Sequence, residues 1–215
     1  MPTDSSPGTS RLPGAALALA TAALAWSAYH PREWMTWLLE VAPAIVAMIV
    51  LTCTYRRFPL TPLLYVLVLL HAVALMIGGH YTYAEVPLGN WLRDRFHLER
   101  NHYDRLGHFM QGFVPAIAAR EVLLRRTPLR TGPWLSFLVG CVCMAISAIY
   151  ELVEWLVSVV VGGTASDAFL GTQGDVWDTQ KDMAFCLIGA VTALATLSRF
   201  HDSLVRERFA PAPAA

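Results

Sequence analysis

The chain has 215 residues, a mean hydropathy of +0.46 and only 15% charged residues. An average soluble domain carries about 25% charged residues, so the composition indicates a protein of the lipid bilayer. The formal net charge is zero, and no basic stripe is present for a nucleic acid or another polyanion, which excludes those partners. Membrane lipids are the expected surroundings.

Six apolar segments are long enough, or nearly so, to form membrane-spanning helices. A helix needs about 20 mainly apolar residues to cross a hydrocarbon core of about 30 Å. The predicted spans, in chain order, are 14–29, 34–54, 60–79, 105–124, 133–161 and 182–199. The Ala-rich first segment superficially suggests a signal peptide, but we expect it to be retained as a short first span.

These spans predict an all-α, polytopic transmembrane helical bundle with a single domain over residues 14–200. Residues 1–13 are predicted to be a disordered N-terminal tail, and residues 201–215 a cytoplasmic C-terminal tail. The external loops of interest are 80–104 and 162–181.

Arginines in the short loops predict the orientation, because Lys and Arg are enriched in cytoplasmic loops. They follow the second, fourth and sixth spans: Arg56 and Arg57; Arg125, Arg126 and Arg130; Arg199, Arg206 and Arg208. With six spans these places share one side, so both termini are predicted to be cytoplasmic. Arg93, Arg95 and Arg100 lie on the other side, where we expect them to be paired within a folded loop.

The start of the fourth span carries the first candidate ligands, His102, Asp104 and His108. Asp104 and His108 are four residues apart and share a helical face, and a carboxylate and an imidazole can bind one metal ion. Asp104 could instead cap the helix N-terminus. A histidine at the depth of His108 is costly without a partner.

The fifth span carries Glu151 and Glu154, three residues apart on one helical face. A carboxylate inside a bilayer costs about 2.5–3.5 kcal/mol on insertion scales, so this pair indicates inward-facing partners or a bound cation. The alternative is a structural ion pair with loop arginines or with Lys181.

The entry to the sixth span adds Asp175, Asp178 and Asp182, which would form one stripe if the segment is helical. Asp175 could be merely solvated, whereas Asp182 leads directly into apolar sequence. His80 and Glu85, after the third span, would join the same external layer.

By topology, all of these polar clusters fall at one face of the membrane. The cytoplasmic side offers only arginines and the pair Arg120 and Glu121. We therefore expect one polar site, at the external face.

The remaining polar and sulfur-containing residues of the spans have structural interpretations. His71 is expected to be a satisfied core histidine. The four cysteines lie in apolar runs and are expected to be small buried side chains rather than disulfides or metal ligands: Cys53, Cys141, Cys143 and Cys186.

Long strings of the chain resemble the YjdF family of uncharacterised bacterial inner-membrane proteins. The strings are "GGHYTYAEVPLG", "RNHYDRLGHFMQGFVPA", "ELVEW" and "FLGTQGDVWDTQKDM", and the resemblance covers roughly residues 35–200. It implies a multi-pass protein of the inner membrane.

The chain is more distantly similar to VanZ-like membrane proteins, a group associated with glycopeptide resistance through the cell envelope. Their pattern has an Asp-x-x-x-His helix start, a Glu-bearing helix and an Asp-containing stretch before a Gly-rich helix. Carried over to this chain, the pattern falls on Asp104, His108, Glu151, Glu154, Asp178 and Asp182.

Three functions are compatible with these residues. The first is a metal-dependent hydrolase or transferase that acts on a lipid or cell-envelope headgroup at the external face, with a divalent Zn, Mn or Mg ion. The second is an ion- or proton-coupled transporter or binding protein, and the third is a non-catalytic membrane assembly factor.

For the enzyme hypothesis, Glu154 or Glu85 is the candidate general base. No Ser-x-x-Lys, Gly-x-Ser-x-Gly or His-Glu-x-x-His string indicates a known hydrolase chemistry. The candidate metal ligands are His80, His102, Asp104, His108, Glu151, Glu154, Asp178 and Asp182.

Overall fold

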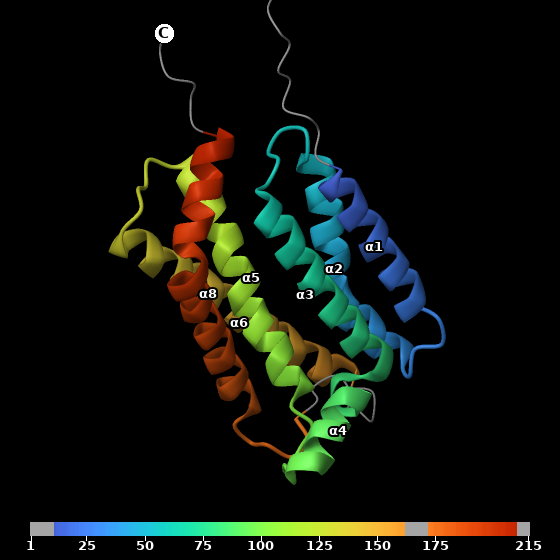
Figure 1. Cartoon of the computed structure of the whole chain (residues 1–215). Helices are drawn as coiled ribbons and strands as arrows, with labels where there is room; N and C mark the ends of the chain where they lie inside the picture. Colours follow the sequence, from blue (N-terminus) through green and yellow to red (C-terminus); the bar gives the residue numbers. More distant parts are fainter. Residues whose placement is uncertain (1–10, 162–171, 210–215) are drawn as a thin grey trace, which may run out of the picture.

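A computed structural model of the chain describes residues 11–161 and 172–209, and these residues form helices and no β-strand (Figure 1). The all-α prediction is confirmed. The long helices are α1 (Leu12–Ser27), α2 (Trp34–Thr54), α3 (Pro62–Tyr81), α5 (Tyr103–Arg126), α6 (Pro133–Val161) and α8 (Asp178–Phe209). A short 3-10 turn, η1 (Tyr83–Glu85), and a short helix, α4 (Pro87–Phe96), lie between α3 and α5.

The helices pack as two groups of three. In one group α3 packs against both α1 and α2, and in the other α5, α6 and α8 pack against one another. The groups meet where α3 contacts α5 (Figure 1). We call the end of the bundle that carries α4 the α4 end, and the end where α1 begins and α8 finishes the opposite end.

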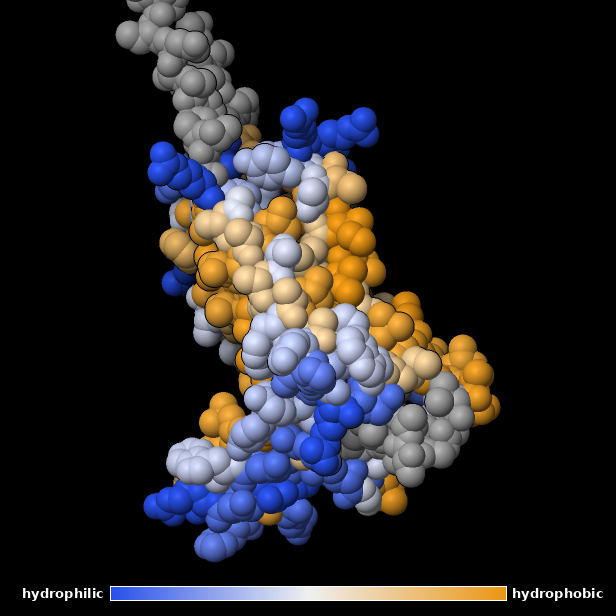
Figure 2. Space-filling model, turned by 90° about the vertical axis from the view of Figure 1, so that its right-hand side faces the viewer, coloured by the Kyte–Doolittle hydropathy of each residue, from blue (hydrophilic) through white to orange (hydrophobic). Residues whose placement is uncertain are grey.

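Four helices, α2, α3, α6 and α8, are long and apolar enough to cross a membrane. Of the other two predicted spans, α1 is apolar but shorter, and α5 carries charged residues near both of its ends. Large apolar side chains such as Ile49, Leu152 and Val191 are exposed on the outside of the bundle. The face seen in Figure 2 has an apolar belt between two hydrophilic ends, as expected for a protein in a bilayer.

Local sequence sets several helix starts. Prolines occupy the first position of α3, α4 and α6, where the missing N–H is not needed. Glu33 caps α2 by accepting hydrogen bonds from the backbone N–H groups of Met35 and Thr36. The side-chain oxygens thereby satisfy two of the free N–H groups of the first turn.

Most boundaries agree with the predictions to within two residues, and the larger differences lie in two places. The predicted loop 80–104 contains α4, which is polar and too short to show the periodicity of a span. The sixth predicted span, 182–199, is part of the longer α8, because its apolar core continues into charged turns at both ends.

The prediction for the cysteines was half right. Cys143 and Cys186 are buried, whereas Cys53 and Cys141 are exposed, and all four are free. The exposed pair faces away from the core on apolar helices, where a small apolar side chain also fits the bilayer.

Two glycines allow α5 and α8 to touch along their backbones. A Cβ atom added at Gly112 would lie 1.8 Å from the carbonyl oxygen of Cys186, and one at Gly189 would lie 2.0 Å from that of Phe109. Small residues at such crossings let membrane helices approach closely. The crossing brings the first turns of α5 beside the first turns of α8.

The variant Gly112→Ala is therefore expected to destabilise the protein by about 1–3 kcal/mol, the usual cost of overpacking. The thermal unfolding midpoint in detergent measures it. Gly140→Ala is the matched control, since no atom lies within 4 Å of a Cβ atom there and alanine favours a helix over glycine. Equal midpoints for the two variants would contradict the close crossing.

Candidate metal centre at the α4 end

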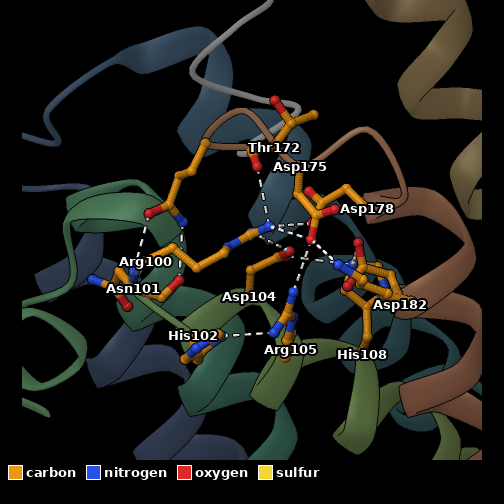
Figure 3. A network of polar contacts seen from close by, with 12 residues as sticks. Arg100, Asn101, His102, Asp104, Arg105, His108, Thr172, Asp175, Asp178 and Asp182 are labelled. Atoms are coloured by element: carbon orange, nitrogen blue, oxygen red, sulfur yellow. Dashed lines mark hydrogen bonds and ion pairs between the residues drawn. The ribbon is translucent and has the colours of Figure 1, made fainter. Parts of the chain in front are cut away.

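Three buried side chains from two helices meet just inside the α4 end of the bundle. Asp104 and His108 lie on the first two turns of α5, and Asp182 lies on the second turn of α8 (Figure 3). His108 Nε2 lies 3.4 Å from Asp104 Oδ1 and 4.0 Å from Asp182 Oδ2. One donor atom from each residue lies within 4.8 Å of the other two. We call Asp104, His108 and Asp182 the trio.

The orientation of the His108 ring suits a metal ligand. Its Nδ1 atom lies 3.2 Å from Gln111 Oε1, an acceptor, and 3.6 Å from Glu151 Oε1. A neutral ring that donates its Nδ1–H to Gln111 keeps the Nε2 lone pair directed at the carboxylates of Asp104 and Asp182. Metal-bound histidines are commonly held in this way by a second hydrogen bond.

Two carboxylate oxygens in this group have no hydrogen-bond partner within the described part of the chain. They are Asp182 Oδ1 and Glu151 Oε1, on residues that are only 3% and 6% exposed. A buried carboxylate oxygen without a donor is costly. A cation between these side chains would remove that cost.

Arg100 connects the start of α5, which carries part of the trio, to the start of α8. Its guanidinium donates to the carbonyl oxygen of Thr172, at 3.0 Å, and to the carboxylate of Asp178 (Figure 3). It also lies 3.7 Å from Asp104 Oδ2. Of the three loop arginines predicted to be paired, Arg93 pairs within the loop with Asp94, and Arg100 pairs mainly across to the start of α8. Arg95 lies over the ring of Phe96.

Asn101 links the start of α5 to the chain before α8. Its backbone N–H donates to Gln173 Oε1 at 3.0 Å, and its carbonyl accepts from Gln173 Nε2 at 2.9 Å. Its fully buried side chain donates to the Val86 carbonyl and to Asn90 Oδ1, and accepts from the Tyr103 N–H. These bonds fix the approach of α5 to α8 from the α4 side.

Asp175 precedes α8 in a turn and accepts hydrogen bonds from two cationic side chains, with Arg100 3.7 Å away. Lys181 Nζ donates to it at 2.6 Å and an Arg105 guanidinium nitrogen at 3.0 Å. The hydrogen bond from Lys181, with one from the Trp177 N–H, lowers the pKa of Asp175. Asp175 therefore stays charged as one half of a surface ion-pair network.

His102 lies immediately before α5, where Arg105 donates to its Nδ1 atom over 3.0 Å. Burial lowers its pKa, and the nearby charges of Arg105 and Arg100 lower it further. The ring is thus neutral at neutral pH and acts as an acceptor for an arginine.

The structure brings some predicted site residues to the trio and not others. Glu151 and Asp178 adjoin it through His108 and Arg100, and Glu154 lines the cavity beside it. His80 instead stacks on Trp26 and hydrogen-bonds the Ser27 carbonyl at 3.0 Å. Glu85 forms an ion pair with Arg32 at 2.6 Å.

Sequence reasoning missed Glu40, Gln111 and Tyr150, which line the cavity next to the trio. Glu40 on α2 is 1% exposed and accepts a 3.4 Å hydrogen bond from the Tyr150 hydroxyl. A glutamate within an apolar span was itself a detectable signal. His71 also lines this cavity, and the prediction that it is satisfied was wrong, because its Nε2 has no hydrogen-bond partner in the described chain.

The prediction that polar clusters occur at only one end was also wrong. At the opposite end, buried Glu121 accepts from Thr61, Arg125 and His201, and Arg120 pairs with Asp202. His201 and Asp202 were missed because they follow the predicted sixth span, whereas α8 continues past them. Each Glu121 oxygen accepts a hydrogen bond. This cluster is therefore structural, and it holds α3, α5 and α8 together.

Residues 12–203 match a family described as "Predicted membrane protein (DUF2238)". The chain belongs to this family. It is 51% identical over 186 residues to "Inner membrane protein YjdF" of Escherichia coli (strain K12), covering 86% of this chain and 88% of that protein. No solved structure matches the chain. With its apolar helices, this DUF2238 protein is an inner-membrane protein, as its sequence strings predict.

The variant Asn101→Ala is expected to destabilise this DUF2238 protein by about 1–3 kcal/mol, because it leaves buried backbone groups of Val86 and Tyr103 without partners. Thermal unfolding measured by circular dichroism tests this. Asn90→Ala is the comparison: it removes one acceptor of the Asn101 side chain and a 3.4 Å bond to the Glu85 carbonyl, but leaves the bonds of Asn101 to Val86 and Tyr103 in place, so it should cost less. A larger loss in Asn90→Ala than in Asn101→Ala would contradict the role of Asn101.

Proposed function

We propose that this protein is a metal-dependent enzyme that acts on the headgroup of a lipid or cell-envelope molecule at the external face of the inner membrane. The trio of Asp104, His108 and Asp182 would hold one divalent cation, Zn, Mn or Mg. The observation that carries the proposal is the buried trio itself, with three donor atoms within 4.8 Å and one carboxylate oxygen that has no donor among the described residues.

The donor set suits such an ion. Zinc binds His nitrogen and carboxylate oxygen at about 2.0–2.2 Å, so donors around it lie about 3.4 Å apart. The 3.4 Å between His108 Nε2 and Asp104 Oδ1 meets this value, and Asp182 needs a small movement. Three protein ligands leave a position open for water or substrate, as in catalytic sites.

The charge balance supports a cation. Around the trio, carboxylates outnumber the cationic side chains that contact them, because Arg105 and Lys181 are engaged with Asp175. Carboxylates gathered inside a bilayer need either protons or a cation. The carboxylates in question are Glu40, Asp104, Glu151, Glu154, Asp178 and Asp182, next to Arg100 and His108.

The distribution of arginines supports an external position for the trio. The opposite end carries the arginine-rich ends of α2, α5 and α8, and such segments favour the cytoplasm. They are Arg56 and Arg57, Arg125 and Arg126, and Arg206 and Arg208. With six spans, both termini would then be cytoplasmic and the α4 end external.

A bound divalent cation would polarise a phosphoryl or carbonyl oxygen and activate a water molecule. His108 would be held in its ligating tautomer by Gln111, and Asp104 in place by Arg100. Glu154 is the candidate general base, because it lines the cavity from which a substrate would reach the trio. The candidate base Glu85 is engaged with Arg32 instead.

A transporter is less well supported than an enzyme. An ion or proton path needs polar groups along its length, but the cavity wall between His71 and Arg126 is apolar except for Thr54. Transporter sites commonly lie near the midplane on broken helices, whereas the trio lies near one end of two continuous helices.

The direct test is metal binding by purified protein. We expect isothermal titration with Zn²⁺ or Mn²⁺ to give one site per chain, and His108→Gln and Asp182→Asn to weaken it by more than about 100-fold, since ligand loss exceeds the effect of losing a supporting residue. Unfolding midpoints near that of the unmodified protein would show that the fold is retained.

Asp94→Asn is the control, because this exposed aspartate lies on α4 and pairs with its chain neighbour Arg93. It should bind the metal as the unmodified protein does. The proposal fails if the unmodified protein binds neither ion stoichiometrically, or if the two trio variants retain full affinity.

A further inference from the structure

A cavity of about 610 Å³ extends from the trio along the bundle. Most of its polar lining, apart from Asp104 and His108 of the trio, gathers near the α4 end and comprises Glu40, His71, Tyr83, Gln111, Tyr150 and Glu154, while Thr54 and Arg126 line the far part. The longer part of the wall is apolar and is built by α2, α3 and α5, with residues such as Leu51, Leu64, Val68 and Val114. We call this cavity the chain groove.

The chain groove is open to the side of the bundle. Val50, Val122 and Ile146 line it and are nevertheless 50%, 45% and 40% exposed. Among the described helices α2 packs on α3 rather than along α5 or α6. The hydrogen bond between Tyr150 and Glu40 links α6 to α2 beside the trio. Because the exposed lining residues are apolar, the side opening would face the hydrocarbon of a surrounding bilayer.

The dimensions suit one hydrocarbon chain. On α5 the lining runs from Asp104 to Arg126, a rise of about 33 Å along a helix, which is close to the thickness of the hydrocarbon core. A methylene group occupies roughly 30 Å³, about the volume of one water molecule in the liquid. The cavity volume of about 610 Å³ therefore accommodates about 20 methylene groups. One acyl chain fits within this volume.

We propose that the chain groove binds one acyl chain of a phospholipid, which enters sideways from the bilayer and presents its phosphate to the trio. This inference rests on the proposed function, because a cation is needed to join an anionic phosphate to the carboxylates of Asp104 and Asp182. The Nε2 atom of His71, which has no hydrogen-bond partner in the described part of the chain, lies between the polar and apolar parts of the groove, where a lipid ester carbonyl would need a hydrogen-bonding group.

The test uses a phosphatidylglycerol that carries a photoactivatable diazirine near the end of one acyl chain, in phosphatidylcholine vesicles containing the full-length protein. After illumination, mass spectrometry locates the labelled peptides. We expect label on the groove-lining faces of α2, α3 and α5, at Leu51, Val68 and the buried Val114 among others, in addition to labelling of the outer surface.

Two variants fill the groove. Ala47→Trp on α2 and Ala118→Trp on α5 each place an indole in the wall, and each should lower groove labelling about tenfold, equivalent to about 1.4 kcal/mol of binding. Ala195→Trp, on an exposed position of α8, is the matched control and should leave groove labelling unchanged. Two separate positions protect the test against misfolding of either variant.

The outcomes separate this inference from the metal proposal. Label found only on outward-facing residues, or groove labelling that both filling variants leave unchanged, would overturn the chain groove even if the metal binds. The protein could bind no metal while both variants block groove labelling. That outcome would support the hydrocarbon site and overturn the part of the inference in which a cation holds the phosphate. Metal binding by both filling variants, together with lost labelling, would support both proposals.

Discussion

The close contact of α5 with α8 is the constraint on which the rest of the structure depends. At Gly112 and Gly189 the two backbones touch, with no room for a Cβ atom. Because the helices cross there, Asp104 and His108 on α5 come beside Asp182 on α8, one or two turns from the crossing. A wider separation would leave these buried groups apart, each needing its own partner.

Polar clusters at both ends of the bundle allow the central helix α5 to carry charge. At the opposite end, Glu121 is satisfied by Thr61, Arg125 and His201, and needs nothing further. At the α4 end, Arg100 satisfies Asp178, but within residues 11–161 and 172–209 Asp182 and Glu151 each keep an oxygen without a donor. This difference separates a structural cluster from a candidate binding site, although both consist of the same residue types.

The sequence predicted the helices and the principal ligands because both depend on local spacing. Apolar runs marked the long helices, and the i, i+4 relation of Asp104 and His108 placed them on one face. What it could not predict depends on contacts between distant segments. His80 hydrogen-bonds the end of α1, and Glu40 on α2 accepts from Tyr150 in the cavity. His201 hydrogen-bonds Glu121, which lies 80 residues earlier in the sequence. No periodicity within one helix reports such pairings.

The central claim is that one cation lies between Asp104, His108 and Asp182. The most direct measurement is an anomalous difference map from crystals grown with Zn²⁺. We predict one peak inside the α4 end, about 2.0–2.2 Å from His108 Nε2 and from one oxygen of each aspartate. Density for zinc only at surface sites, with the trio unchanged from its 3.4 and 4.0 Å separations, would contradict the account.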